Sequence, residues 1–386
     1  MLRRSRSVSE IALVALVGLS IAGCNPERAA RRELESDGYT EVTLTKTASK
    51  TFSFTARNAS QQHCTGDVAV SGGSVTVTSM CSDVCTKTES TKCFSLAEQL
   101  EKTDPTKATQ YYVIGCEAGD AASCVNAGVA YGKGTGVTAD DVQSFVYDKK
   151  GCDGGDPQGC VNLGIDYEEG LGTPKDLAAA FRVSDAACTK KNMAGCSMSG
   201  RLLITGKGVP PDVIQGVDRL DRACTGDVIV ACTNLGSYLV EGTHGVTRDT
   251  KRGQDLLEAA CAKNEATACS NLGLYFMQKR LSDPTGAKMI ADLTKGCDGK
   301  EGAGCNTLAY VTENGLGGLK ADLAQALVTY QRGCDFGHGL ACRNVGLFHQ
   351  FGRGTTKDLT KAAAAYDAGC KLGDDKSCIK RKELPI

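Results

Sequence analysis

Three patterns of apolar and polar residues divide the chain. Residues 11–20, IALVALVGLS, are almost all apolar and follow the basic stretch MLRRSRSVSE. Residues 39–81 are rich in threonine and valine in alternation, which is the period of half-buried strands. From residue 85 onward, short apolar stretches with helical spacing, such as VNLGIDY at 161–167, follow recurring cysteines. The pattern predicts a processed N-terminus, a small strand-rich module and a long helical part.

The helical part is predicted to be an array of helical hairpins. Its cysteines form nine pairs with seven residues between partners, and from Cys116 onward the first cysteines recur every 36 or 37 residues, a length that fits two helices and their loops. In seven of eight units an aspartate twelve residues before the next pair is predicted to cap a helix, and a small residue follows four positions later. In most units a glycine four residues after the second cysteine indicates a close helix contact, and a G-x-G loop ends that helix. The capping aspartates are Asp104, Asp140, Asp176, Asp212, Asp249, Asp322 and Asp358, and the helix glycines are Gly128, Gly164, Gly200, Gly236, Gly273 and Gly346.

Each C-x7-C pair is predicted to be a disulfide between the end of one helix and the start of the next. A disulfide needs Cα atoms about 5.5 Å apart, closer than ordinary helix axes, and from Cys116 onward every cysteine follows a glycine, alanine or serine. A metal site is excluded because the 4 histidines do not recur beside the pairs and the spacing is not a zinc spacing. A reactive dithiol stays open as the alternative. The predicted pairs are Cys85–Cys93, Cys116–Cys124, Cys152–Cys160, Cys188–Cys196, Cys224–Cys232, Cys261–Cys269, Cys297–Cys305, Cys334–Cys342 and Cys370–Cys378.

Residues 24–84 are predicted to form a small module of one helix and a β-hairpin. Residues 25–38 have the capping pattern of a short helix, with asparagine and proline at its start and glycine at its stop. A Gly-Gly pair at 72–73 has the composition of a two-residue hairpin turn. The register that this turn imposes places Cys64 opposite Cys81, on the closer, non-hydrogen-bonded type of pair. A tenth disulfide, Cys64–Cys81, is therefore predicted.

The N-terminal residues resemble a bacterial lipoprotein signal peptide. The basic and apolar segments end in IAGC, which resembles a lipobox with Cys24 as the first mature residue. Residues 1–23 would then be removed, and the thiol and new amino group of Cys24 would carry acyl chains. A single transmembrane helix or an ordinary cleaved signal peptide are the alternatives, although the apolar run is short for a membrane span. Either kind of secretion places the chain where disulfides persist.

Charge excludes one class of partner. The chain has 44 basic and 45 acidic residues, a net charge of -1, so neither a nucleic-acid-binding surface nor a polybasic membrane patch is indicated. Recurrent asparagines are candidates either for peptide binding or for tying repeats together, and the need to pair buried polar groups favours the structural role. They are Asn126, Asn162, Asn234, Asn271 and Asn344.

Over residues 85–378 the pattern C-x-N-x-G-x-x-Y, G-x-G and D-x-x-x-A resembles the SEL-one-like repeat (SLR) family, a longer relative of the tetratricopeptide repeat. The cysteine pairs are similar to those of its disulfide-linked branch, the Helicobacter cysteine-rich proteins. The resemblance implies an all-α helical-hairpin solenoid whose inner surface binds proteins or peptides. For the cysteine-rich branch it also implies penicillin binding with β-lactamase activity. Related repeat proteins with such disulfides imply a role in haem or respiratory-complex assembly.

The residues themselves give the hydrolase alternative little support. A serine β-lactamase needs S-x-x-K together with S-D-N and K-T-G. The one S-x-x-K match runs from Ser377 to Lys380 beside the last cysteine, and the other two motifs are absent. The sixth unit, with Thr285 in place of the aspartate and Met289 in the small position, marks a bend, a partner contact or, the favoured interpretation, sequence drift.

The sequence thus predicts an all-α solenoid at residues 85–386 behind the α+β module at 24–84. The expected function is that of a monomeric scaffold in the cell envelope, anchored through Cys24 on the periplasmic or outer-membrane face, with an unknown protein or peptide partner and no cofactor. A β-lactam-binding protein or β-lactamase is the alternative, and a haem or respiratory-complex assembly factor is the second alternative.

Thiol counting checks the pairing. Protein that lacks the first 24 residues should show no free thiol when it is denatured without a reductant, because every remaining cysteine has a predicted partner. A stoichiometric reaction with a thiol reagent before reduction would contradict the pairing and favour the reactive dithiol.

Overall fold

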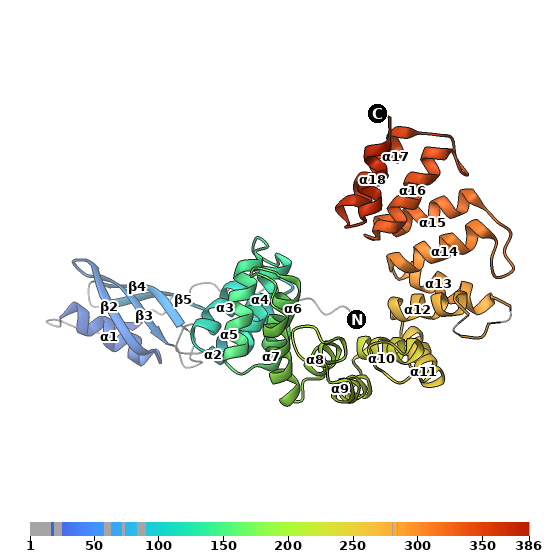
Figure 1. The fold of residues 1–386 in the computed structure, drawn as a ribbon. Coiled ribbons are helices and arrows are strands. Elements are labelled where there is room, and N and C mark those ends of the chain that lie inside the picture. The colour runs from blue at the N-terminus through green and yellow to red at the C-terminus, as the bar shows by residue number, and fades with distance from the viewer. Residues whose placement is uncertain are drawn as a thin grey trace, which may run out of the picture. The chain divides into compact units, whose positions relative to one another are not determined.

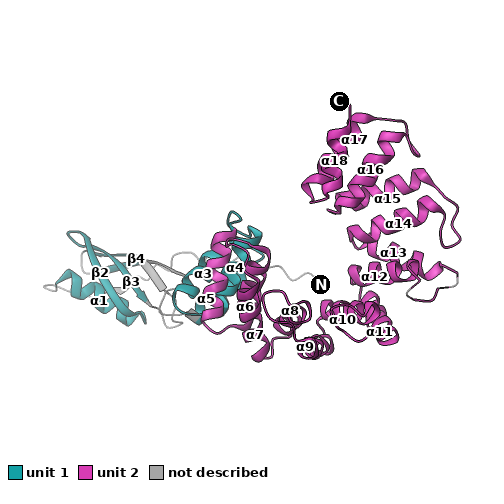
Figure 2. Cartoon of the chain, viewed as in Figure 1, with its two compact units in different colours: residues 1–140 teal, residues 141–386 magenta. Residues whose placement is uncertain are grey.

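The chain folds as a small sheet followed by a long run of antiparallel helices (Figure 1). The computed structural model describes residues 17–18, 25–57, 63–71, 74–82, 90–279, 281–283 and 285–385. Two units are distinguished by their internal contacts, residues 1–140 and 141–386 (Figure 2). Cys24, Cys85, the turn at 72–73 and most of the expected signal peptide lie outside the described residues.

The N-terminal module is one helix packed on an antiparallel sheet. Helix α1 spans Pro26–Ser36, and the strands are β1 Val17–Gly18, β2 Thr40–Ala48, β3 Thr51–Arg57, β4 His63–Ser71 and β5 Ser74–Ser82, in the order β1-β5-β4-β3-β2. The Asn25 side chain caps α1 by accepting from the Glu27 amide, as predicted. Leu34 of α1 is buried with Phe52, Phe54 and Val68 of the sheet, which makes the core of the module.

The predicted register of the β4–β5 hairpin is confirmed. Val70 pairs with Val75, and Cys64, six residues before Val70 in β4, pairs with Cys81. The backbone therefore places the two cysteines opposite each other, as a Cys64–Cys81 disulfide requires. That disulfide itself stays a prediction.

The rest of the described chain is helical, and within each of the two compact units every helix packs on the next. The helices are α2 Ser90–Leu100, α3 Pro105–Glu117, α4 Ala121–Lys133, α5 Asp141–Asp153, α6 Pro157–Glu169, α7 Leu177–Thr189, α8 Met193–Thr205, α9 Val213–Thr225, α10 Ile229–Glu241, α11 Thr250–Ala262, α12 Ala266–Met277, α13 Ala287–Asp298, α14 Gly302–Asn314, α15 Leu323–Asp335, α16 Gly339–Phe351, α17 Leu359–Lys371 and α18 Asp375–Glu383. The predicted fold class, an all-α array of hairpins behind a small α+β module, is confirmed.

Capping residues set where these helices begin and end: aspartate side chains at the start and left-handed glycines at the end. Six of the predicted aspartates are N-caps whose carboxylates accept a backbone N–H of the first turn, namely Asp104, Asp176, Asp212, Asp249, Asp322 and Asp358. The first glycine of each G-x-G loop is a left-handed C-cap, as at Gly170 with φ 78°. The second glycine lies against the start of the preceding helix, because a Cβ on Gly172 would lie 2.1 Å from the Asp141 carbonyl oxygen. The loop therefore closes each hairpin against its own first helix.

Disulfides cross-link the short connections between helices and make each connection a covalent joint. Eight of the expected pairs are bonded in the structure, and their Cα atoms lie 4.4–4.8 Å apart. Cys93 also takes part in a disulfide. Small neighbours permit this approach: a Cβ on Gly159 would lie 2.7 Å from the Cys152 backbone nitrogen.

The helix glycines and the small positions meet each other across the array. A Cβ on Gly236 of α10 would lie 3.0 Å from the carbonyl oxygen of Gly253 in α11, and one on Gly253 would lie 2.7 Å from the carbonyl oxygen of Gly236. Gly200 of α8 and Gly216 of α9 are related in the same way, at 3.0 and 2.8 Å. The backbones of these helices are thus in direct contact, which is the close approach that the sequence predicted.

The irregular sixth unit keeps the hairpin by other means. Asp283 takes over the cap, because its Oδ2 accepts the Met289 amide at 2.8 Å. Met289 is buried, and its Cε lies 2.8 Å from where Gly317 would carry a Cβ. A larger side chain in the small position is therefore accommodated by a glycine loop opposite it.

Substitution of Gly253 tests the contact between helix backbones. Gly253→Ala should lower the free energy of unfolding by about 1–3 kcal/mol, because the added methyl meets backbone atoms that have no alternative position. This loss should exceed the gain of about 1 kcal/mol in helix propensity. The measurement is urea unfolding, with Lys251→Ala on the exposed side of the same helix as the control, and equal or increased stability of Gly253→Ala would refute the contact.

Candidate partner-binding surface

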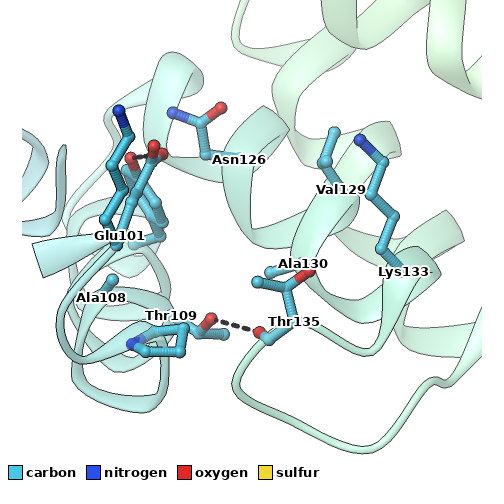
Figure 3. A pocket seen from close by; sticks show the side chains of 11 residues that line it. Glu101, Ala108, Thr109, Asn126, Val129, Ala130, Lys133 and Thr135 are labelled. Atoms are coloured by element: carbon cyan, nitrogen blue, oxygen red, sulfur yellow. Dashed lines mark hydrogen bonds between the residues drawn. The ribbon is translucent and has the colours of Figure 1, made fainter.

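The first cavity lies between α3 and α4, within residues 1–140, and has a volume of about 340 Å³ (Figure 3). Helix α3 contributes small and aromatic side chains, α4 contributes aliphatic and amide side chains, and the connections contribute the polar ends. The lining residues are Glu101, Lys102, Pro105, Ala108, Thr109, Tyr112, Asn126, Val129, Ala130, Lys133 and Thr135. The Thr109 hydroxyl donates to the Thr135 carbonyl at 2.9 Å and so ties the loop after α4 to α3.

A buried polar group forms one wall of this cavity. The Tyr112 hydroxyl donates to Glu101 Oε1 at 2.5 Å and is hydrogen-bonded to the Asn126 amide. Burial, and then the Glu101 carboxylate, raise the pKa of Tyr112, whereas the Asn126 bond lowers it. The phenol therefore stays neutral at physiological pH and serves to hold Glu101 in place.

Two lysines at the edge of the cavity have free charges. Lys102 and Lys133 are exposed, and neither has an ion-pair partner among the described residues. The wall beside them is apolar, formed by Pro105, Ala108 and Val129. A cavity of this kind can take an aliphatic side chain of a partner and place a carboxylate of the same partner beside the ammonium groups.

A second cavity lies near the C-terminal end of the helical array. It lies between α16 and α18, has a volume of about 410 Å³ and includes Asn344, Leu347, Lys376 and Ile379. Asn344 and Leu347 stand two and five residues after the second cysteine of their unit, as Asn126 and Val129 do. The same two repeat positions therefore line a cavity in both units.

The recurrent asparagines connect helices, as favoured from the sequence. Asn271 Nδ2 donates to Ser237 Oγ on α10 at 2.9 Å, and Asn344 Nδ2 donates to Asn306 Oδ1 on α14 at 2.9 Å. Asn162 Nδ2 donates to Asp148 Oδ1 on α5 at 3.0 Å. At these positions the amide ties neighbouring helices together.

Ser377 and Lys380 do not form a nucleophile–base pair. Ser377 is fully buried, and its hydroxyl donates to the capping carboxylate of Asp374 at 2.6 Å. Lys380 Nζ donates to Glu383 instead, at 2.7 Å. Ser123 occupies the same position in α4 and makes the same bond to Asp120. The serine is therefore part of the helix joint.

The described parts of the chain contain no group of three or more histidine, cysteine, aspartate or glutamate side chains placed to hold a metal ion. No helix there is long and apolar enough to span a membrane.

The sequence pointed to the repeats but not to the cavities. Glu101, Lys102 and Lys133 have no counterpart in the repeat pattern, so nothing in that pattern singled them out. The usable signal was Tyr112, which stands eight residues after the capping Asp104, where Tyr330 and Tyr366 stand in two later units. Two of these tyrosines bond a glutamate, Tyr112 to Glu101 and Tyr330 to Glu313.

Substitution of the two equivalent serines distinguishes a structural role at the helix joint from a catalytic role. Ser377→Ala and Ser123→Ala should each lower the free energy of unfolding by about 1–2 kcal/mol, since each removes a buried hydrogen bond to a carboxylate. Both variants should show the same nitrocefin turnover as the parent protein. Turnover in the parent that is lost in Ser377→Ala alone would show that this serine is catalytic.

Solved structures with this fold come from several bacteria. An SLR-fold protective antigen from uropathogenic Escherichia coli strains matches with a TM-score of 0.58 and 21% identity, over 76% of this chain and 65% of that chain. A Sel1 repeat protein from Oxalobacter formigenes matches with a TM-score of 0.53 and 18% identity, over 77% of this chain and 86% of that one. Cysteine rich protein B of Helicobacter pylori has 26% identity and a TM-score of 0.29, over 33% of this chain and 91% of that one. The chain thus spans just under two thirds of the E. coli antigen.

A comparison with curated proteins gave no match. The family model of the Sel1 repeat matches residues 95–120, 121–156, 157–182, 229–265, 303–338 and 339–374, just over half of the chain. The unmatched intervals include the irregular sixth unit, yet the helical hairpins continue through them. Repeat period, hairpin geometry and matched segments agree, and the chain belongs to the Sel1 repeat family.

Proposed function

We propose that this chain is a lipid-anchored scaffold of the cell envelope that binds a protein partner through the cavities along its helical hairpins. Sel1 repeat proteins mediate protein–protein interactions. The observation that carries the proposal for this chain is the cavity between α3 and α4, where an apolar wall stands beside the free ammonium groups of Lys102 and Lys133. A partner segment with an aliphatic residue next to a carboxylate complements that surface.

The disulfides support an extracytoplasmic place of action. Eight are formed among the described residues, and disulfides in this number indicate an oxidising compartment. We infer that Cys24 carries the lipid and that residues 24–84 stand between the anchor and the repeats. The short α1 helix begins at Pro26, two residues after this cysteine, so the folded module would start at the membrane surface.

The locked joints suit binding without rearrangement. A hairpin whose connection is cross-linked loses little further freedom when a partner binds, so the ordering cost of association is small. Rim charges mainly set the rate and selectivity of association. We therefore expect the two lysines to select an acidic partner and the apolar wall to hold it.

Crosslinking in the native envelope, followed by mass spectrometry, tests this function. A lysine-reactive crosslinker should join Lys102 or Lys133 to one recurrent partner. In affinity capture of that partner without a crosslinker, Lys102→Glu with Lys133→Glu should reduce its recovery about tenfold, because both attractive charges become repulsive. The control is Lys320→Glu with Lys357→Glu, two exposed lysines outside both cavities, and equal losses in the two double variants would refute the site.

Fractionation of the same cells tests the lipid anchor. Cys24→Ser should move the protein out of the membrane fraction, and unchanged fractionation would refute the anchor.

A further inference from the structure

Two carboxylates occupy core positions that hold no other charged residue in the array. The first position stands eight residues after the capping residue, and the second stands six residues after the second cysteine of the pair. In α5 the first position is Asp148, whereas the other units have Tyr112, Ser184, Leu220, Leu257, Leu293, Tyr330 and Tyr366 there. In α6 the second position is Asp166, whereas the other units have Ala130, Leu202, Tyr238, Tyr275, Val311, Phe348 and Leu384.

These two positions face each other within a hairpin. In α15 and α16 they hold Tyr330 and Phe348, whose ring centroids are 5.5 Å apart. The α5–α6 hairpin has the same disulfide joint and the same loop closure, so Asp148 and Asp166 take the places of those rings. An acidic pair thus replaces the apolar centre of this hairpin.

The pair is buried without a counter-charge. Asp148 is 3% exposed and Asp166 is 5% exposed. Asp148 accepts from Asn162 Nδ2 at 3.0 Å and from Ser144 Oγ at 3.3 Å, but Asp166 Oδ2 has no hydrogen-bond partner. A buried, unpartnered carboxylate oxygen costs free energy when it is charged and much less when it is protonated.

The charged side chains on the surrounding helices have other partners or act elsewhere. On α5, Lys149 pairs with Asp153 and Lys150 lies over the Tyr147 ring. Glu168 of α6 pairs with Arg201 of α8, and Asp185 of α7 pairs with Arg219. Neither these groups nor Arg182 of α7 contributes to the pKa of Asp148 or Asp166. The one further charge that acts on the pair is Asp141, at the start of α5, and it is another carboxylate.

We propose that Asp148 and Asp166 make the α5–α6 hairpin a proton-dependent latch, closed while the pair holds protons and loosened when both carboxyls ionise. Burial raises the pKa of Asp148 to about 6. Burial, followed by the charges of Asp148 and Asp141, raises the pKa of Asp166 to about 7. These values lie above the pKa of about 3.9 for an exposed aspartate, so the closed hairpin binds more protons than an open one. Its stability is therefore fully present at low pH and is lost as the pH rises through about 6 to 7.

The disulfide keeps this change local. Cys152 and Cys160 hold the ends of α5 and α6 together at a Cα separation of 4.4 Å, whatever the state of the carboxyls. Loosening therefore affects the middle of the hairpin and its far end, where the G-x-G loop rests on α5.

Hydrogen exchange read by mass spectrometry on the mature chain tests the latch. Protection in α5–α6, corrected for the intrinsic pH dependence of exchange, should fall roughly tenfold to a hundredfold between pH 5.5 and pH 8. The internal control is the α9–α10 hairpin, which has the same joint but Leu220 and Tyr238 at the two positions. An equal pH response in both hairpins would overturn the proposal, and this comparison needs no variant.

Variants then assign the effect to the pair. Asp148→Leu with Asp166→Tyr, which installs the residues of α9–α10, should abolish the pH response of α5–α6. Asp255→Asn, an exposed aspartate on α11, should leave the response unchanged. A response that persists in the double variant would overturn the proposal. Addition of Ca²⁺ to the wild-type protein at pH 8 gives a further test. If Ca²⁺ restored the protection seen at pH 5.5, the pair would be a cation site and the proposal would be overturned.

Discussion

Where each disulfide forms, two helices approach until their cysteine Cα atoms are 4.4–4.8 Å apart, much closer than helices packed through ordinary side chains. Only glycine, alanine or serine fits beside such a joint, as Gly159 beside Cys152 illustrates. Large side chains are therefore excluded from the joint and are concentrated in the middle of each hairpin, where Tyr330 meets Phe348. The position of the covalent bond thus decides where the apolar core of every unit lies.

The same constraint explains why the cross-links matter for stability. The chain has only 5% aromatic residues and no tryptophan, and each hairpin has a small core of its own. In the chain-entropy model a loop of this length contributes roughly 2–3 kcal/mol when it is closed by a disulfide. A repeat array depends on the stability of each unit and of its contacts with the next, so cross-links in successive hairpins protect the whole run from local opening.

The α5–α6 hairpin shows what happens when the middle of a hairpin is not apolar. Its joint and loop are those of its neighbours, but Asp148 and Asp166 stand at two positions that hold uncharged, mostly aromatic or aliphatic, side chains in the other hairpins. The sixth unit shows the opposite case, because Met289 adds volume at a small position and the structure compensates with Asp283 as a cap and Gly317 opposite the side chain. A changed residue is therefore accommodated at the loop end of the hairpin, whereas the two carboxylates at the centre of α5–α6 have no counter-charge.

Periodicity alone determined the repeat, the fold class, the capping aspartates and the cysteine pairs, because each is a local pattern with a fixed spacing along the chain. The β4–β5 register followed from the same kind of argument, since strand pairing counts outward from a two-residue turn and places Cys64 opposite Cys81. The cavity between α3 and α4 was decided only by the tertiary structure. Glu101 and Lys102 come from the irregular connection after α2, and they reach Tyr112 and Lys133 only when α3 and α4 fold back beside it. The free lysines and the unpartnered oxygen of Asp166 depend likewise on which side chains fail to meet, and a spacing along the sequence does not specify that.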